Sequence, residues 1–291
     1  MIVSNIIGGI GNQMFQYAAG RSLSILHNCP LLLDTSDFDG YLLHNGFELD
    51  HVFDISAKIA KKENLESLLG WQYHKKIRRF IKHDKLKIIR KSNYIVEPHF
   101  NHWKNLSQIS PPYYLDGYWQ SELYFNDVID TIRRDFIFKE SLTGKNKELS
   151  EKIDETNSVS IHIRRGDYLN NKNKKIHCIC SLQYYQASIN KILEKINNPT
   201  FFIFSDDIEW SRKNLTTDFD TTYISHNIGK TSYNDMNLMS LCKNNIIANS
   251  SFSWWGAWLN SNQNKIVIAP KKWFSVKKNT TNLYPSLWIV I

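Results

Sequence analysis

The stretch SVSIHIRRGDY at residues 158–168 predicts the fold of the second half of this chain. Its apolar residues stand at every second position from 159 to 163, the pattern of a β-strand, and Gly166 with Asp167 then predicts a turn. The rest of this half alternates strands and helices in the same way, with strands at 201–207, 245–251 and 265–270 and helices at 181–196, 232–243 and 251–260. Such alternation predicts a parallel, doubly wound α/β sheet.

Two arginines follow the strand at 158–163. Side chains two residues apart share a strand face, so we expect Arg164 to point the same way as Ser160 and His162. Arg165 should then point the other way. Parallel sheets bind ligands at the carboxyl ends of their strands, and a guanidinium there is shaped to contact phosphate or carboxylate oxygens. The alternative interpretation is a strand that ends in a solvated, salt-bridged turn.

Polar residues also end the next strong strands, with Asp206 and Asp207 after one and Ser250 and Ser251 after the other. If these strands lie beside the strand at 158–163, all three polar ends meet along one edge of the sheet. Ser250 or Ser251 would also begin a helix, whose positive dipole end favours an anion. Together with Arg164 the serines predict a diphosphate site, although helix capping alone would also explain them.

Two acidic positions have competing explanations. Asp235 follows Ser232 by three residues, which is a capping-box pattern, so both capping and ligand contact remain open. Asp206 and Asp207 would suit a divalent metal, but no histidine or third carboxylate lies near them in sequence. Hydrogen bonds to ribose hydroxyls or to a base are the alternative for this pair.

The first half predicts a second α/β domain. An apolar strand at 2–7 is followed by a glycine turn at 8–11 and a helix, with further strands at 31–34 and 93–97. The turn is neither a dinucleotide fingerprint nor a P-loop, because Met14 replaces the third glycine and no Gly-Lys-Ser/Thr follows. The polar run 139–157 is the best boundary, so we expect domains 1–150 and 151–291 that face each other across a cleft.

An aromatic stretch, YYLDGYWQSELYF, occupies residues 113–125. Aromatic rings beside carboxylates hold sugars or bases in many proteins, and they also fill ordinary cores. Both interpretations remain open for this stretch.

The composition is that of a globular protein, with 291 residues, of which 42% are hydrophobic and 13% aromatic. Four cysteines are too few for a disulfide framework, and the HCIC sequence at 177–180 lacks a second pair for a metal site. The N-terminus has no signal-peptide pattern, and no run approaches the roughly 18 apolar residues of a membrane span. We therefore expect a cytoplasmic protein with reduced thiols.

Positive charge is concentrated between residues 58 and 91, where twelve Lys or Arg stand against three Asp or Glu. Within this stretch Ile77, Ile81 and Ile88 have near-helical spacing among the cations. An amphipathic helix on the inner face of the cytoplasmic membrane, or on an acidic polysaccharide, is one interpretation. A solvated helix face is the other. A nucleic-acid partner is not expected, because the aromatic residues lie elsewhere.

Five motifs resemble, in order, those of bacterial α-1,2-fucosyltransferases of glycosyltransferase family 11: GGIGNQMFQYAAG at 8–20, GYWQSELYF at 117–125, SIHIRRGDY at 160–168, FIFSDD at 202–207 and DMNLMSLCKNNIIANSSFSWWGAWLN at 235–260. The resemblance implies a GT-B-like fold of two Rossmann-like domains. It also implies inverting, metal-independent transfer of L-fucose from GDP-fucose to the 2-hydroxyl of a galactose residue, without a cofactor. The acceptor would be a galactose-terminated glycan of a bacterial surface polysaccharide such as O-antigen, and a lipid-linked acceptor would explain the basic stretch.

The resemblance also implies roles for individual residues. By this resemblance Arg164 would bind the donor pyrophosphate, with His162 beside it, and Ser250, Ser251 and Phe252 would line the phosphate and sugar pocket. Asp206 and Asp235 would contact the nucleoside. Asn12, beside Gly11, would approach the donor from the first domain. We expect the acceptor near Trp119, Gln120 and Glu122.

The inverting reaction should also have a group that takes the proton of the acceptor hydroxyl. Glu97, Asp116 and Glu122 are candidates, with Glu97 named as the base, and each is equally a candidate structural carboxylate. The alternative functions are a nucleotide-sugar hydrolase or epimerase on the same scaffold, and a non-catalytic glycan-binding module.

Overall fold

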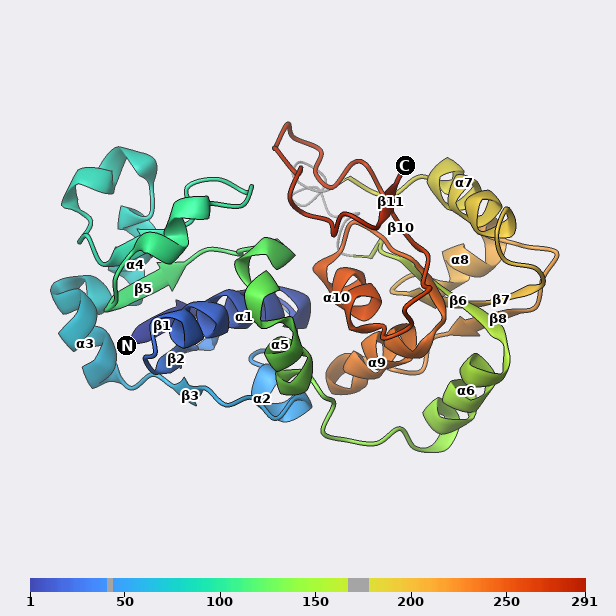
Figure 1. Cartoon of the computed structure of the whole chain (residues 1–291), viewed down its shortest axis with the longest axis horizontal. Helices are drawn as coiled ribbons and strands as arrows, with labels where there is room; N and C mark the ends of the chain where they lie inside the picture. The colour runs from blue at the N-terminus through green and yellow to red at the C-terminus, as the bar shows by residue number, and fades with distance from the viewer. Residues whose placement is uncertain (41–43, 167–177) are drawn as a thin grey trace. The chain divides into compact units, whose positions relative to one another are not determined.

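The computed structural model describes residues 1–40, 44–166 and 178–291. They form two compact units, each with its own parallel sheet (Figure 1). The first unit comprises Met1–Lys139 and Asn279–Leu283, and the second comprises Glu140–Lys278 and Tyr284–Ile291. Residue 150, where the sequence placed the boundary, falls inside helix α6 (Gly144–Glu155) of the second unit. The turn expected at Asp167, the loop after it and His177 of the HCIC sequence lie outside the described residues.

The first sheet has five strands in the order β3-β2-β1-β5-β4, and every pairing is parallel. The strand bounds are β1 (Ile2–Asn5), β2 (Leu31–Asp34), β3 (Lys58–Ile59), β4 (Tyr94–Val96) and β5 (Tyr113–Asp116). The first strand along the chain, β1, has a neighbour on either side. The strand order therefore reverses between β1 and β5, and sheets of this type bind ligands outside such a switch point.

Helix α1 follows the glycine turn, where Gly8 has a φ of +86°. A Cβ at Gly8 would lie 2.8 Å from Nδ2 of Asn12, so a larger residue would have to displace the Asn12 side chain in addition to adopting this positive φ. The α-helices of this unit are α1 (Ile10–Leu26), α2 (Leu49–Val52), α3 (Lys62–Leu69), α4 (Lys75–Ile81) and α5 (Ile129–Asp135). The 3₁₀ helices are η1 (Ser36–Phe38), η2 (Gly70–Tyr73), η3 (Asp84–Ile89), η4 (Lys104–Gln108), η5 (Glu122–Tyr124) and η6 (Asn126–Val128).

A core cluster explains why the basic stretch is helical. Leu65, Leu68 and Leu69 of α3 and Ile81 of α4 are buried in one cluster with Tyr94 and Tyr114 of the sheet. The apolar spacing in the sequence thus presents one side of these helices to the sheet. The helices expected between residues 58 and 91 are confirmed.

The second sheet has six parallel strands in the order β11-β10-β9-β6-β7-β8. The strand bounds are β6 (Asn157–Ile163), β7 (Pro199–Ser205), β8 (Thr221–Ile224), β9 (Asn244–Ile246), β10 (Val267–Ala269) and β11 (Ile289–Val290). Its first strand, β6, lies between β7 and β9, so this sheet has its switch point between β6 and β9. The predicted doubly wound α/β class is confirmed.

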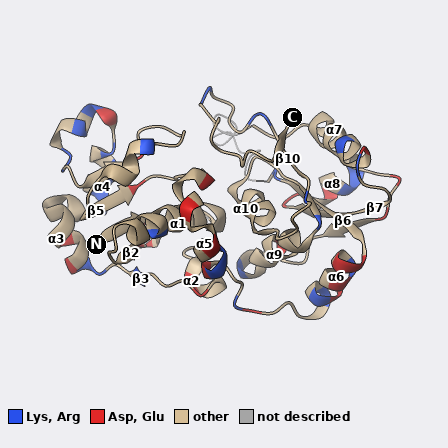
Figure 2. Cartoon of the chain, viewed as in Figure 1, with Lys and Arg blue, Asp and Glu red and all other residues tan. Residues whose placement is uncertain are grey.

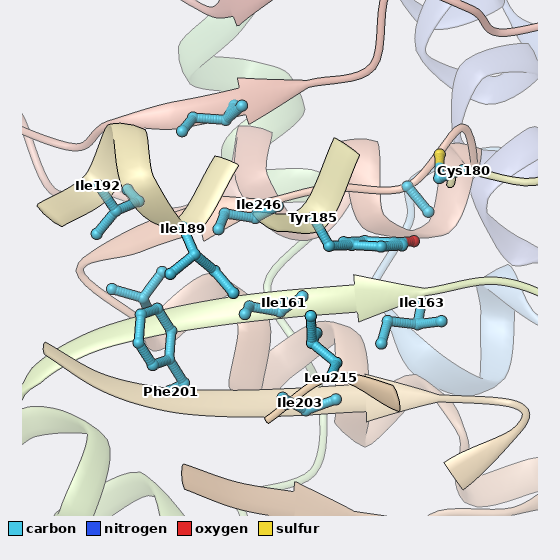
Figure 3. Packing of buried hydrophobic residues seen from close by; sticks show 13 residues of the cluster. Ile161, Ile163, Cys180, Tyr185, Ile189, Ile192, Phe201, Ile203, Leu215 and Ile246 are labelled. Atoms are coloured by element: carbon cyan, nitrogen blue, oxygen red, sulfur yellow. The ribbon is translucent and has the colours of Figure 1, made fainter. Parts of the chain in front are cut away.

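The helices of the second unit are α6 (Gly144–Glu155), α7 (Leu182–Leu193), α8 (Ile208–Asn214), α9 (Tyr233–Leu241) and α10 (Ser251–Leu259), with the short η9 (Gly229–Thr231). Figure 3 shows Ile161 and Ile163 of β6 beneath Tyr185 and Ile189 of α7. This buried cluster fixes β6, and with it the residues at its carboxyl end. No described helix has both the length and the apolar character needed to cross a membrane.

Candidate active site

Three strand ends converge in the second unit, as the sequence predicted. β6 pairs with β7 on one side and β9 on the other, and Ile163 stands opposite Ser205 in the register. Arg164 and Asp206 are the next residues along these two strands. They therefore meet, with Nη1 of Arg164 3.2 Å from Oδ2 of Asp206.

Arg165 makes a different set of contacts from Arg164, in agreement with the predicted alternation of faces. Its guanidinium carbon lies 3.8 Å from the ring centroid of Trp210 on α8, and its Nε lies 3.4 Å from Oδ2 of Asp207. Oδ1 of Asp207 accepts the backbone N–H of Trp210 at 3.3 Å and so caps α8. Arg165 and Asp207 thus fasten α8 to the end of β6.

Asp206 orders the turn after β6. Its Oδ1 accepts the backbone N–H of Arg165 at 2.8 Å, while its Oδ2 pairs with Arg164. A Cβ at Gly166 would lie 3.1 Å from Oδ2 of Asp206, so glycine permits this close approach. Over residues 1–40, 44–166 and 178–291, no group of three His, Cys, Asp or Glu is arranged to hold a metal ion. Contact of Asp206 with a nucleoside stays a prediction.

His162 lies beside helix α10. Its ring centroid is 5.8 Å from that of Phe252 in the first turn of this helix. Burial and the charge of Arg164 lower the pKa of His162 to about 3. The imidazole is therefore neutral at physiological pH, and its buried Nδ1 has no hydrogen-bond partner within the described part of the chain.

Helix α10 begins at the third strand end, just after β9. Ser250 is its N-cap residue, but the Ser250 side chain makes no capping hydrogen bond. Simple capping therefore does not account for this serine. The contact between Phe252 and His162 places the positive end of the helix next to the end of β6. A helix start beside an arginine favours the binding of an anion.

Asp235 lies in the first turn of α9 and binds a neighbouring loop. Its Oδ1 accepts a hydrogen bond from Nδ2 of Asn227 at 2.7 Å, and Asn227 is held in turn by Asn146 of α6 at 2.8 Å. Ser232 makes no side-chain capping bond, so the capping box is not formed. Burial raises the pKa of Asp235 to about 7. Contact of Asp235 with a nucleoside stays a prediction.

In the first unit, the structure brings the glycine turn and the aromatic stretch together. Nε2 of Gln120 donates to Oδ1 of Asn12 at 2.7 Å. The two carboxylate oxygens of Glu97 accept the backbone N–H groups of Tyr118 at 2.8 Å and of Trp119 at 3.1 Å. These bonds stabilise the turn, where Trp119 is fully buried with a φ of +54°. Glu97 has a structural role here, and its role as the base remains a prediction.

The remaining residues predicted for the first unit lie on short elements nearby. Gly11 is buried in the first turn of α1, next to Asn12. Glu122 begins η5. Burial lowers the pKa of Arg133 on α5, and the charges of Asp130 and Glu122 partly oppose this shift.

A pocket of about 100 Å³, which the sequence did not reveal, lies at the switch point of the first sheet. Nδ2 of Asn5, at the end of β1, donates to Asp37 at 3.2 Å and to Asp116, at the end of β5, at 3.4 Å. Sequence reasoning weighed only Asp116, as a base. The rule applied to the second half, that polar residues at strand ends mark a site, would have found Asn5 and Asp116 here.

The cations around this pocket come from the basic stretch. Arg78 pairs with the buried Asp34 at 2.9 Å, and Arg79 pairs with Asp37 at 3.1 Å. Lys82 pairs with Asp116. Ion pairs thus hold this side of α4 against the strand ends. The interpretation of a solvated helix face does not apply to the buried Arg78, whereas Arg79 and Lys82 are 61% and 45% exposed.

The family model for Glycosyl transferase family 11 matches residues 2–291. An Alpha-1,2-colitosyltransferase from Escherichia coli is 39% identical over 100% of this chain and 99% of its own length. The O-antigen biosynthesis glycosyltransferase WbnK, also from Escherichia coli, is 34% identical over 98% and 99%. Galactoside alpha-(1,2)-fucosyltransferase 1 of Rattus norvegicus is 24% identical over 87% of this chain and 61% of its own length.

Among solved structures, NodZ alpha-1,6-fucosyltransferase soaked with GDP-fucose resembles this chain with a TM-score of 0.57. The match covers 89% of this chain and 91% of the other, at 15% identity. At that identity the likeness is one of fold, and it agrees with the expected pair of Rossmann-like units of the GT-B type.

Proposed function

Because the chain belongs to glycosyl transferase family 11 and is thus a glycosyltransferase, we propose that it transfers L-fucose from GDP-fucose to the 2-hydroxyl of a galactose residue. The proposed transfer inverts the anomeric carbon and uses neither a metal ion nor a cofactor. The product would be part of a surface glycan such as O-antigen, which is the role in the name of WbnK.

One observation carries the donor half of this proposal: Arg164 and the uncapped start of α10 lie at the switch point of the second sheet. Cleavage of the bond between fucose and phosphate leaves negative charge on GDP. Fixed donors at the diphosphate lower the energy of that transition state, and an arginine beside a helix start supplies both charge and N–H groups. Neutral His162 can add one hydrogen bond but no charge.

Identity of the donor sugar is the point on which the relatives differ. The bacterial relative at 39% identity is named for transfer of colitose, which is the 3-deoxy counterpart of L-fucose, whereas the mammalian relative is named for fucose. We favour fucose because all five motifs resemble those of fucosyltransferases, and GDP-colitose is the second candidate donor.

We place the acceptor on the first unit, near Trp119, Gln120 and Glu122, with the pocket at Asn5 and Asp116 as a neighbouring polar site. Paired carboxylates and cations around a pocket can bind the hydroxyls of a sugar as both acceptors and donors. The proposed location of the enzyme is the cytoplasm, where nucleotide sugars are used.

The test is release of GDP in the presence of EDTA, measured for GDP-fucose, GDP-colitose and GDP-mannose against galactose-terminated oligosaccharides and water alone. The proposal expects release only with GDP-fucose and a galactoside, unchanged by EDTA. Faster release from GDP-colitose would assign the second donor. Release in water alone would favour the hydrolase, and glycan binding without any GDP binding would favour the glycan-binding module.

A further inference from the structure

The segment of residues 70–91, formed by η2, α4 and η3, carries nine Lys or Arg and one acidic residue. Figure 2 shows basic residues on α4 and on the turns that follow it. Some side chains of this segment contact the strand ends, and others are exposed to solvent.

One side faces the strand ends. Lys75, Arg78 and Lys82 lie three and four residues apart, so they share a face of α4. Nζ of Lys75 donates to the carbonyl oxygens of Ser36 and Asp37 at 3.1 Å, while Arg78 and Lys82 pair with carboxylates. These contacts fix the orientation of the segment on the sheet.

The same segment also exposes large apolar side chains. Trp71 is 57% exposed, Phe80 65%, Ile88 93% and Ile89 46%. Apolar residues of this size at such exposure are scattered singly on most surfaces, but here four occur within nineteen residues. Their backbone segments are joined, because Nε2 of Gln72 donates to the carbonyl of Ile89 at 2.7 Å.

Three lysines accompany these apolar residues. Lys76 precedes Phe80 by four residues and so shares its helix face. In η3, Lys85 precedes Ile88 by three residues and Lys87 by one. All three are exposed, and the structure gives them no ion pair among the described residues. Their Nζ groups are therefore accessible to an external anion.

We propose that this face, made by Trp71, Lys76, Phe80, Lys85, Lys87 and Ile88, docks on an anionic lipid membrane. A membrane interface takes exposed aromatic and aliphatic side chains between its head groups while lysines contact anionic phosphates. A protein partner fits less well, because lysine is depleted at the centre of protein interfaces. Arg78, Arg79 and Lys82 line the pocket and pair with carboxylates there, so the docking face does not include them.

The test is flotation of the full chain with vesicles of phosphatidylcholine alone or with about one third phosphatidylglycerol, without substrate. Each lysine near an anionic surface strengthens binding by roughly fivefold, so the triple variant Lys76→Gln, Lys85→Gln, Lys87→Gln should bind roughly a hundredfold more weakly. The double variant Phe80→Ser, Ile88→Ser should lose at least about tenfold. Wild-type binding should require phosphatidylglycerol and weaken with salt.

Matched controls come from the second unit. One control is the triple variant Lys195→Gln, Lys213→Gln, Lys277→Gln, which makes the same charge change at exposed lysines. The other is Leu287→Ser, which changes a side chain that is 92% exposed. Both controls should bind vesicles as the wild type does. Absence of vesicle binding, or equal loss in the controls, would overturn the proposal. Concentration-dependent dimers in sedimentation that the Phe80→Ser, Ile88→Ser variant abolishes, without vesicle binding, would assign the face to a second copy instead. None of these measurements depends on transferase activity.

Discussion

Asp206 and Arg164 extend from neighbouring strands and meet with Oδ2 3.2 Å from Nη1, each side chain being about a quarter exposed. Seven paired residues of β6 and β7 set these two positions opposite each other. An ion pair with this exposure contributes at most about 1 kcal/mol to stability. Its main effect is to orient the guanidinium at the sheet edge.

Arg164→Ala should therefore lower kcat by about 100- to 1,000-fold, because a fixed donor to the leaving diphosphate is lost. The melting temperature should change little. Arg165→Ala is the matched control, since it removes the contact with Trp210 and should lower stability more than turnover. Turnover near the wild-type value in Arg164→Ala would refute the assignment of this arginine to the diphosphate.

Ser250→Ala should leave the free energy of unfolding within about 0.5 kcal/mol of the wild type, because no capping hydrogen bond is lost. A capping serine would cost about 1 kcal/mol. We expect the same substitution to raise the KM for the sugar nucleotide, since the hydroxyl would bind the donor. A stability loss without a change in KM would restore the capping interpretation. Urea unfolding and steady-state kinetics measure the two effects.

His162 makes stability depend on pH in a direction that can be measured. Its pKa is lowered from 6.5 to about 3 in the folded chain, so below pH 6.5 the unfolded chain binds more protons. The contribution of the neutral ring to the free energy of unfolding is fully present above about pH 6.5 and is lost as pH falls towards 3. His162→Phe should consequently lose less stability than the wild type between pH 7 and pH 5 in urea titrations. Parallel pH curves for the two proteins would contradict the lowered pKa.

Asp235 should act in the opposite direction. Burial raises its pKa from 3.8 to about 7, so the folded chain binds the extra proton between these values. Its contribution to stability is full below about pH 3.8 and is lost as pH rises towards 7. Asp235→Asn, which stays neutral, should gain stability relative to the wild type as pH rises through this window. A pH-independent difference between the two proteins would show that the carboxyl titrates normally.

Arg78→Met should destabilise the first unit by about 3–5 kcal/mol, because it leaves the carboxylate of Asp34 buried without its cation. The side chains of this pair are only 4% and 2% exposed, at 2.9 Å. Arg134 of α5 is exposed, and among the described residues its side chain bonds Thr131 of its own helix, so Arg134→Met should stay within about 0.5 kcal/mol of the wild type. Adding Asp34→Asn to Arg78→Met should recover part of the loss; no recovery would mean that packing of Arg78 matters more than its charge.

The fold of the second unit could be predicted because its two central strands have clear patterns: β6 alternates apolar with polar residues, and β7 contains the apolar run 201–204. β5 of the first unit was harder to recognise, since all of Tyr113–Asp116 is buried and no alternation marks it as a strand. β3 has only two residues, both exposed, and exists because it pairs with β2. Such a strand carries no pattern of its own.

Contacts between residues that are distant in sequence limited how much of the candidate site could be predicted. Asp37 and Lys82 form one pocket with Asn5 and Asp116. The two strand ends could be predicted, but no local pattern links Asp37 or Lys82 to them. Whether Ser250 caps α10 depends on its side-chain rotamer, which the sequence does not determine. The contact of Arg164 with Asp206 could be predicted in part, because each residue directly follows a strand and the carboxyl ends of neighbouring parallel strands lie side by side.

The first unit includes the short segment Asn279–Leu283, whose residue Asn282 donates its backbone N–H to Oδ1 of Asn101 at 3.1 Å and accepts a hydrogen bond from Ser121. The chain then returns to the second unit and supplies its edge strand β11. A single cut near residue 139 would consequently yield two incomplete fragments, the first without the partner of Ser121. If either half is expressed separately, residues 279–283 should therefore be joined to the N-terminal portion. The same holds if halves are exchanged between relatives to swap donor and acceptor preference.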